Sequence, residues 1–370
     1  MKFSMKKTER PIKSREVFIV CLIGIFSLFL ISCSNRTSCE GMQNLKNNWD
    51  NRLQYVGVVI EDEEYNIWGS SPIWGNDGKV HVFASRIPAE TGFYKWWATS
   101  QIAHYVSDQP EGPFEFVEVL LEPGQTAPGS WDSGTQHNPT ITKIDDLYVL
   151  SYHSGMGTLE DRKRPTMRIG MMIASDINGP WQKLGKILDT PTSDESDVVP
   201  PGYNGGTDNP ALIRHPDGRF FLYYRLKFPG MEGGNTYGVA IADQLEGPYT
   251  HYPSRVVNNP TYIEDPYVFV YDSLIYMLIT DAKSRAGLLL SSEDGLHFDY
   301  NEAVRGYGEL SDYVPPDKMP TPLPDMPGGC FERPQLLLKD GLPTYLYAPS
   351  GVNMNGGENS CCYLFKILYE

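Results

Sequence analysis

One short sequence unit recurs five times along the chain, and this repetition constrains the fold more than any other feature. Each unit has a proline at the start of a short apolar strand, then a tight turn, then a second strand rich in aromatic and β-branched residues. The prolines that begin the units are Pro72, Pro139, Pro210, Pro266 and Pro334, spaced 56 to 71 residues apart. Each interval is long enough for one four-stranded sheet, and the fifth unit ends at the C-terminus.

The turns within each unit point to antiparallel hairpins. Three of the five carry Asp-Gly, namely Asp77-Gly78, Asp217-Gly218 and Asp340-Gly341. Asp-Gly between apolar strands indicates a hairpin, because glycine accepts the positive φ of a two-residue turn. A further pattern, Gly-Pro-aromatic, recurs at Pro113, Pro180 and Pro248 and predicts an outer turn before a fourth strand. Radial repetition of such sheets predicts an all-β fold, a five-bladed β-propeller of four-stranded antiparallel sheets.

The N-terminus has the features of an export signal. Basic residues precede an apolar run from Val17 to Ile31, which is short for a membrane span. The run ends in Leu30-Ile31-Ser32-Cys33, which resembles the bacterial lipobox, whose cysteine receives lipid; an ordinary signal peptide is the alternative. The resemblance implies a lipoprotein signal peptide over residues 1–32, a lipidated tether over 33–50 and the propeller over 51–370. It also implies a cell-envelope protein, anchored by Cys33 in the bacterial outer membrane.

Charge and cysteine content exclude some classes of function. The formal net charge is −15, and the first 32 residues are predominantly basic, so the remainder is more acidic still. An acidic surface argues against nucleic acid as a partner. No Cys/His spacing resembles a zinc site. In an exported protein, a disulfide between Cys330 and either Cys361 or Cys362 is a possible staple for the last blade. The sequence predicts no cofactor and no metal, and it leaves a bound calcium open.

Acidic residues precede several of the repeat prolines. The first strand of each propeller blade lines the central channel, so these residues are expected to face one funnel. They are Asp208, Glu264, Asp265 and Glu332. Asp and Asn before proline also form turns, which is a structural explanation for any one of them. Four carboxyl groups at matching positions favour a functional cluster.

At these positions the chain resembles the five-bladed propeller glycosidases of glycoside hydrolase families 43, 32, 62 and 117. The stretch from Asn209 to Tyr224 is similar to a family 43 blade, and the resemblance covers residues 55–370. Those families use an aspartate base in blade 1, a positioning aspartate in a middle blade and a glutamate acid in a Glu-x-Pro motif. The resemblance therefore implies Glu264 as general acid and Asp208 as the positioning residue. Ser71 holds the expected place of the base, so an acid from residues 61–64 is implied instead, with Asp62 and Glu64 as the main candidates.

The chemistry requires one protonated and one ionised carboxyl group. The first donates a proton to the leaving oxygen, and the second activates water. Crowded carboxylates raise the pKa of one member. In the inverting arrangement that the resemblance implies, the pair stands roughly 6.5–9.5 Å apart. Further candidates for contact with substrate are Arg86, His137, Arg225, Asp265, Glu332 and Arg333.

The sequence therefore predicts a lipid-anchored propeller glycosidase that acts on oligosaccharides from plant or algal polysaccharides. A glycan-binding surface lipoprotein without catalysis is the alternative, favoured by the serine at position 71. A phosphorolytic enzyme is a third possibility, and it requires a cluster of basic residues that grip phosphate. Only Arg333 and Arg225 are candidates for such a cluster.

Overall fold

The computed structural model describes residues 49–161, 164–196, 199, 201, 205–227, 234–320, 327–350 and 359–369. The predicted signal peptide, Cys33 and nearly all of the predicted tether lie outside these residues. No helix in the part that the structure describes is long and apolar enough to cross a membrane.

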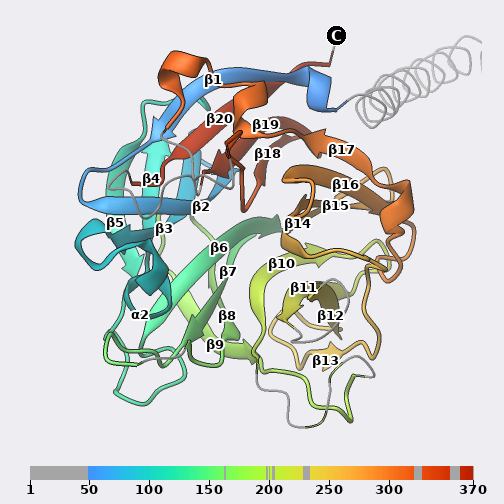
Figure 1. Cartoon of the computed structure of the whole chain (residues 1–370). Coiled ribbons are helices and arrows are strands. Elements are labelled where there is room, and N and C mark those ends of the chain that lie inside the picture. The colour runs from blue at the N-terminus through green and yellow to red at the C-terminus, as the bar shows by residue number, and fades with distance from the viewer. Residues whose placement is uncertain are drawn as a thin grey trace, which may run out of the picture. The chain divides into compact units, whose positions relative to one another are not determined.

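Five four-stranded antiparallel sheets form the fold, as predicted (Figure 1). Blade 1 consists of β2 (Tyr65–Trp74), β3 (Val80–Pro88), β4 (Gln101–Ser107) and β5 (Glu115–Leu121). Blade 2 consists of β6 (Thr135–Ile144), β7 (Leu147–Gly155), β8 (Arg168–Ala174) and β9 (Gln182–Leu188). Blade 3 consists of β10 (Asp208–Arg214), β11 (Phe220–Lys227), β12 (Asn235–Ala242) and β13 (Thr250–His251). Blade 4 consists of β14 (Ile263–Tyr271), β15 (Leu274–Asp281), β16 (Ala286–Ser292) and β17 (Val304–Tyr307).

Blade 5 combines the two ends of the described chain. It consists of β18 (Gln335–Lys339), β19 (Leu342–Pro349), β20 (Cys362–Ile367) and the N-terminal strand β1 (Leu53–Ile60). Strand β1 pairs antiparallel with β20, from Leu53 opposite Ile367 to Ile60 opposite Cys362. The sequence repeat did not predict this strand, because β1 has no unit of its own. Backbone hydrogen bonds between distant segments therefore close the ring.

Short helical elements occur only in connections among the described residues. They are helix α2 (Trp96–Thr99) and 3₁₀ turns at Asp50–Arg52, Ala89–Thr91, Phe93–Lys95, Tyr300–Glu302, Leu310–Asp312 and Pro316–Lys318. Helix α2 contacts β6 and β7 of blade 2. It therefore brings residues of blade 1 to the edge of blade 2.

Side chains between neighbouring blades form the hydrophobic core. Phe221 of blade 3 and Met277 of blade 4 share one buried cluster, and Val149 of blade 2 and Leu222 of blade 3 share another. Each such side chain contributes about 1.5–3 kcal/mol through burial. Inner strands such as β6 and β10 are almost wholly buried, whereas the outermost strands β5 and β9 are largely exposed. Polar groups on the inner strands are thus enclosed by protein.

A bulge in the inner strands corrects the predicted register of blade 1. Pairing between the first two strands is interrupted at Trp68–Ser71, His137–Thr140, Asp208–Ala211 and Glu264–Tyr267. In blades 2 to 4 the proline is the third residue of this bulge, and the third residue in blade 1 is Ser70. The prediction that Pro72 begins the unit and that Ser71 replaces the base was therefore wrong. Trp68 stands where blades 3 and 4 have Asp208 and Glu264.

The second residue of each bulge has a left-handed backbone and lies near the axis. These residues are Gly69, Asn138, Asn209 and Asp265; Arg333, which precedes β18 of blade 5, has the same conformation, and the five φ angles lie between 44° and 63°. Glycine, Asn and Asp tolerate this conformation better than other residues. The turn-forming explanation of Asn and Asp before proline is thus correct for this second position, but it does not extend to Asp208 or Glu264.

Gly69→Ala is expected to lower the free energy of unfolding by about 2–3 kcal/mol. The backbone has φ +57°, and an added Cβ meets Asn138 Oδ1 at 3.0 Å and Arg333 Cγ at 3.3 Å. Gly78→Ala is the matched control, because Gly78 also has positive φ (+80°) but nothing within 4 Å of the added atom. Chemical denaturation measures both variants. Equal losses of unfolding free energy in the two variants would show that the close contacts of the added Cβ at position 69 do not affect stability.

The described cysteines are free thiols, so the possible staple of blade 5 is not present. Cys330 and Cys362 are buried and Cys361 is partly exposed. Cys330 Sγ lies 3.7 Å from Glu332 Oε1, and Cys362 Sγ lies 3.7 Å from the carbonyl oxygen of Tyr363. Each of these two thiols thus has a polar partner other than a cysteine.

Candidate functional site

A ring of hydrogen bonds around the axis supports the acidic cluster. Asn138 Nδ2 donates to Asn209 Oδ1 at 2.7 Å, and Asn209 Nδ2 donates to Asp265 Oδ1 at 2.6 Å. The peptide N–H of Arg333 donates to Asp265 Oδ2 at 3.0 Å. These residues come from four different blades, so the ring fixes the inner strands relative to one another.

The guanidinium of Arg333 extends this ring across the axis. Its Nη2 donates to the carbonyl oxygens of Asn138 (3.2 Å) and Pro210 (3.3 Å) and to Thr140 Oγ1 (2.8 Å). Its Nη1 lies 3.5 Å from the carbonyl oxygen of Pro266. Burial lowers the pKa of Arg333 to about 10, which still leaves it charged at neutral pH. All of these partners belong to the framework, which makes Arg333 a structural cation; its contact with substrate stays a prediction.

Asp208 and Glu264 are held by one arginine. Arg225 lies opposite Asp208 in the β10–β11 register. Its Nε and Nη2 donate to the two carboxylate oxygens of Asp208 at 2.7 and 2.9 Å. Its Nη1 reaches Glu264 Oε2 at 2.6 Å. The two carboxyl groups that the sequence predicted to converge therefore share a cation. The side chains of Asp208 and Arg225 are 4% and 7% exposed, whereas that of Glu264 is 22% exposed.

Arg164, which precedes β8, gives Asp208 a second ion pair through its Nη2. Burial alone raises a carboxyl pKa, but the charges of Arg225 and Arg164 hold the pKa of Asp208 well below its usual range. Asp208 is therefore ionised at neutral pH. It cannot donate a proton to a substrate.

Asp208→Asn is expected to lower the free energy of unfolding at pH 7, and by a smaller amount at pH 3. The folded-state pKa lies below the unfolded value of about 3.9, so Asp208 contributes stability above that value and loses it as the pH falls toward the folded pKa. Denaturation of wild type and variant at both pH values measures the difference. Asp145→Asn is the control, because Asp145 pairs with Arg214 on the surface. If the free energies of unfolding of wild type and Asp208→Asn differ by the same amount at both pH values, the expectation is contradicted.

Glu332 occupies the corresponding place in blade 5 and is only partly buried. Desolvation raises its pKa to about 8, with further increases from the nearby charges of Glu264 and Asp265. Asp265 is 3% exposed, and its pKa is also raised by burial, against the opposing charges of Arg333 and Arg225. Glu332 is thus a carboxyl group that holds a proton at neutral pH, and it lies beside Glu264, which forms an ion pair with Arg225.

Glu264, Asp265 and Glu332 each place one carboxylate oxygen within 4.8 Å of the other two. This spacing is compatible with a shared cation. However, Glu264 already forms an ion pair with Arg225, and both oxygens of Asp265 accept hydrogen bonds from Asn209 and Arg333. We therefore assign no metal to this cluster.

Aromatic and histidine side chains flank the cluster on the blade 2 side. His137 stacks on Trp96 with 4.5 Å between ring centroids and lies 2.8 Å from Ser100 Oγ. His153 Nδ1 accepts the peptide N–H of Asn209 at 3.1 Å. Burial holds the pKa of both histidines well below 6.5, so both rings are neutral. The guanidinium of Arg164 lies over the ring of Trp96, 4.7 Å from the ring centroid.

The other predicted site residues lie away from these contacts. Asp62 and Glu64 lie in the β1–β2 connection, where Asp62 Oδ1 accepts the peptide N–H of Glu64 at 2.8 Å. Glu64 is exposed and Asp62 is partly exposed. Arg86 lies 3.8 Å from the ring centroid of Tyr65 and 4.7 Å from that of Phe116 in the outermost strand. The structure brings none of the three into contact with the central carboxyl groups.

Arg164 and His153 contact the cluster but were not predicted as site residues. Arg164 comes from a connection with no repeat signal. The one available indication was charge balance, because several enclosed carboxylates require nearby cations. His153 follows from the pairing of β7 with β6, where it lies opposite His137.

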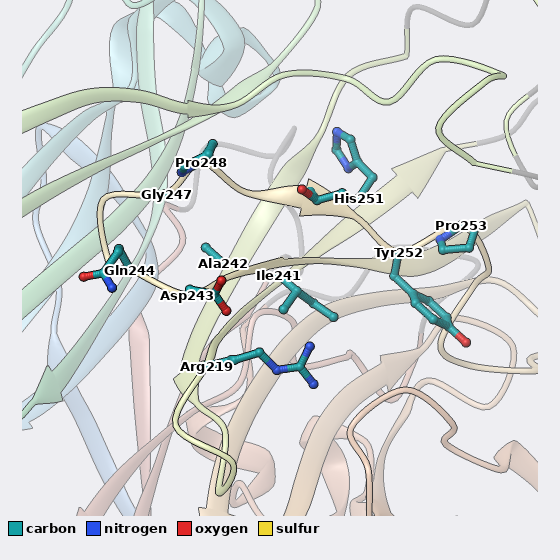
Figure 2. A pocket seen from close by; sticks show the side chains of 11 residues that line it. Arg219, Ile241, Ala242, Asp243, Gln244, Gly247, Pro248, His251, Tyr252 and Pro253 are labelled. Carbon is teal, nitrogen blue, oxygen red and sulfur yellow. The ribbon is translucent and has the colours of Figure 1, made fainter.

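Two cavities lie at the other end of the strands. One, of about 690 Å³, is lined by blade 3 residues that include Arg219, Asp243, His251 and Tyr252 (Figure 2). The other, of about 370 Å³, is bounded by Trp74, Lys143 and Leu338 near the ends of three inner strands. Arg219 and Asp243 belong to turns at the end of blade 3 opposite to Asp208. Neither of these two cavities contains a residue of the carboxyl cluster, so the converging charges locate the candidate site.

Comparison with known proteins gives matches in structure only. No family model and no curated protein matches the chain. Zg3597, a family 117 glycoside hydrolase produced by the marine bacterium Zobellia galactanivorans, aligns with TM-score 0.59 and 16% identity over 85% of this chain and 90% of that chain. A solved structure of BT0996, described as an RGII complex, aligns with TM-score 0.61 and 13% identity over 88% of this chain and 94% of that chain.

A third solved structure is CoXyl43, a family 43 β-xylosidase/α-arabinofuranosidase from a compost microbial metagenome, in complex with xylotriose. It aligns with TM-score 0.52 and 12% identity over 85% of this chain and 93% of that chain. At such identities the likeness concerns the fold alone. The structural neighbours thus include family 117 and family 43 glycoside hydrolases, and the predicted resemblance to propeller glycosidases is confirmed at the level of fold.

Proposed function

We propose that this protein hydrolyses glycosidic bonds in oligosaccharides derived from plant or algal polysaccharides. One observation carries the proposal: one carboxylate oxygen of Glu264 and one of Glu332, both partly exposed residues, lie within 4.8 Å of each other beside Arg225. One carboxyl group forms an ion pair with an arginine and the other has a raised pKa, and glycoside hydrolysis needs one ionised and one protonated carboxyl group. The structural neighbours with glycosidase activity support the same class of reaction.

The test is an assay of purified protein against aryl pentosides and hexosides and against plant and algal oligosaccharides. Hydrolysis of at least one substrate is expected, and Glu264→Gln is expected to abolish it. Glu118→Gln is a matched control on the exposed strand β5. Activity that survives Glu264→Gln undiminished would refute the assignment of the site.

A glycan-binding protein without catalysis is the second candidate. The register of blade 1 supports it, because blade 1 has the buried Trp68, and no acid, where blades 3 and 4 have Asp208 and Glu264. Oligosaccharide binding by calorimetry with no turnover of any substrate would favour this alternative. The phosphorolytic alternative has less support, since Arg333 and Arg225 are both bonded to internal carbonyl or carboxylate groups.

We also propose that Cys33 carries lipid and anchors the protein in the outer membrane of the cell envelope. The apolar run followed by Leu30-Ile31-Ser32-Cys33 supports this location. Incorporation of labelled palmitate that is lost in Cys33→Ala tests it. Equal labelling of the two proteins would contradict the proposal.

A further inference from the structure

We propose that Tyr94 and Trp97 form an outer sugar-binding subsite, which holds a distant part of an oligosaccharide whose glycosidic bond lies at the carboxyl cluster. This inference rests on the glycosidase function proposed above. It makes an extended oligosaccharide, rather than a single glycoside, the preferred substrate. Both aromatic residues belong to the β3–β4 connection, residues 89–100.

The β3–β4 connection borders the end of the propeller at which the carboxyl cluster lies. Arg225 lies near the end of β11, opposite Asp208, and His153 lies near the end of β7. Strand β3 is the second strand of blade 1, as β7 and β11 are of blades 2 and 3. The connections that follow β3 and β7 therefore emerge at the same end as the cluster.

Helical geometry turns Tyr94 and Trp97 away from the blades. A 3₁₀ turn runs directly into α2, and residues three apart share one face of such a turn. Phe93 and Trp96 form the inner face, which packs on Trp68. Tyr94 and Trp97, each one residue further along, form the adjacent face. Tyr94 is 52% exposed and Trp97 is partly exposed.

Trp96 connects this outer face to the carboxyl cluster. His137 stacks on Trp96 with 4.5 Å between ring centroids, and the guanidinium of Arg164 lies 4.7 Å from its centroid. Protein groups therefore already cover this ring. Arg164 in turn forms an ion pair with Asp208. Contacts thus run without a break from the central carboxyl groups, through Arg164 and Trp96, to Trp97.

The β7–β8 connection adds exposed apolar groups beside Trp97. A Cβ at Gly157 would lie 2.5 Å from the carbonyl oxygen of Trp97, so glycine permits this close passage of the two connections. Met156 and Leu159 of the same connection are 45% and 52% exposed. Exposed apolar side chains from two blades therefore gather at this edge of the site.

The mixture of groups fits a sugar chain. Sugar rings have apolar C–H faces that pack on aromatic rings, and hydroxyl groups that accept hydrogen bonds from cations. Tyr94 and Trp97 supply the rings. Lys95 Nζ lies 5.0 Å from the ring centroid of Trp97, and the side chain of Arg164 is 24% exposed. The unbroken contact with the carboxyl cluster favours the substrate as occupant over another protein or a lipid surface.

Substrates of different length test the subsite. Trp97→Ala is expected to lower kcat/KM for a plant or algal oligosaccharide about 3–10-fold more than for the aryl glycoside of the same sugar. Tyr94→Ala, at a more exposed position, should act in the same direction and serves if Trp97→Ala does not fold. Phe116→Ala is the matched control, because Phe116 is 50% exposed on the outermost strand β5. Equal effects on both substrates in Trp97→Ala and Tyr94→Ala would overturn the inference and leave the proposed function intact.

Calorimetry tests the subsite without turnover. The Glu264→Gln protein is titrated with plant and algal oligosaccharides of increasing length. Affinity is expected to rise with length and to fall about 3–10-fold when Trp97→Ala is added. Such binding, with no hydrolysis of any substrate by wild type, would overturn the proposed function but support the subsite. An affinity that does not depend on Tyr94 or Trp97, or no binding of any oligosaccharide, would overturn the subsite.

Discussion

Arg333→Met is expected to lower the free energy of unfolding by about 3–5 kcal/mol, the largest stability change that we expect from one substitution in this protein. The variant removes a fully buried cation and leaves Asp265 with less compensation of its buried charge. It also leaves the carbonyl oxygens of Asn138 and Pro210 without their guanidinium donor. Methionine fills much of the volume, so most of the loss is electrostatic.

Denaturation midpoints measure this effect, and Arg219→Met is the matched control. Arg219 pairs with Asp217 at the surface and is 45% exposed, so the control should change stability by less than about 1 kcal/mol. Arg333→Lys retains the positive charge but lacks the planar guanidinium group. Its loss of unfolding free energy should therefore lie between those of Arg333→Met and Arg219→Met. A loss for Arg333→Met no larger than that for Arg219→Met would show that the axial hydrogen bonds do not hold the blades together.

Arg225→Lys is expected to reduce kcat by about 10²–10³-fold with a smaller change in KM. This prediction rests on the proposed function. Arg225 bonds Asp208 through two nitrogens and Glu264 through a third, a geometry that a lysine ammonium cannot reproduce. Arg225 is a positioning residue, because it acts through Glu264. The lysine variant keeps the buried positive charge, so it is expected to fold.

Steady-state kinetics and far-UV circular dichroism distinguish positioning from stability for Arg225. The matched control is Arg214→Lys in the same blade, because Arg214 pairs at the surface with Asp145 of blade 2. A folded Arg225→Lys protein with a lower kcat and a similar KM supports the role. A kcat equal to that of the control excludes it, whatever the effect on stability.

Local sequence determined the blades and the convergence of four acids. Hairpin turns are local properties, so Asp77-Gly78 and Asp217-Gly218 mark turns wherever the blades lie. Asp208 and Glu264 were correctly expected to converge, because equivalent positions of inner strands meet at one axis. The close approach of both to Arg225 agrees with that expectation.

Tertiary structure alone decided the closure of the ring and the register of blade 1. Strand β1 pairs with β20, more than 300 residues away, and such pairing leaves no local pattern. In blade 1, Gly69 stands where blades 2 to 4 have Asn or Asp, and Ser70 stands where they have proline. Pro72 was therefore mistaken for the proline of the repeat. A bulge is defined by its partner strand, which the sequence of one strand does not reveal.

Tertiary structure also separated the acids by role, although all four occur in similar sequence contexts. Asp265 is bonded within the axial ring and Asp208 is paired with two arginines, and both are buried, whereas Glu264 and Glu332 are partly exposed. The sequence thus determined which carboxyl groups meet, because strand position is encoded locally. Their charge states and accessibility depend on the desolvation and ion pairs that each acquires after folding, and these come from distant segments such as the one that carries Arg164.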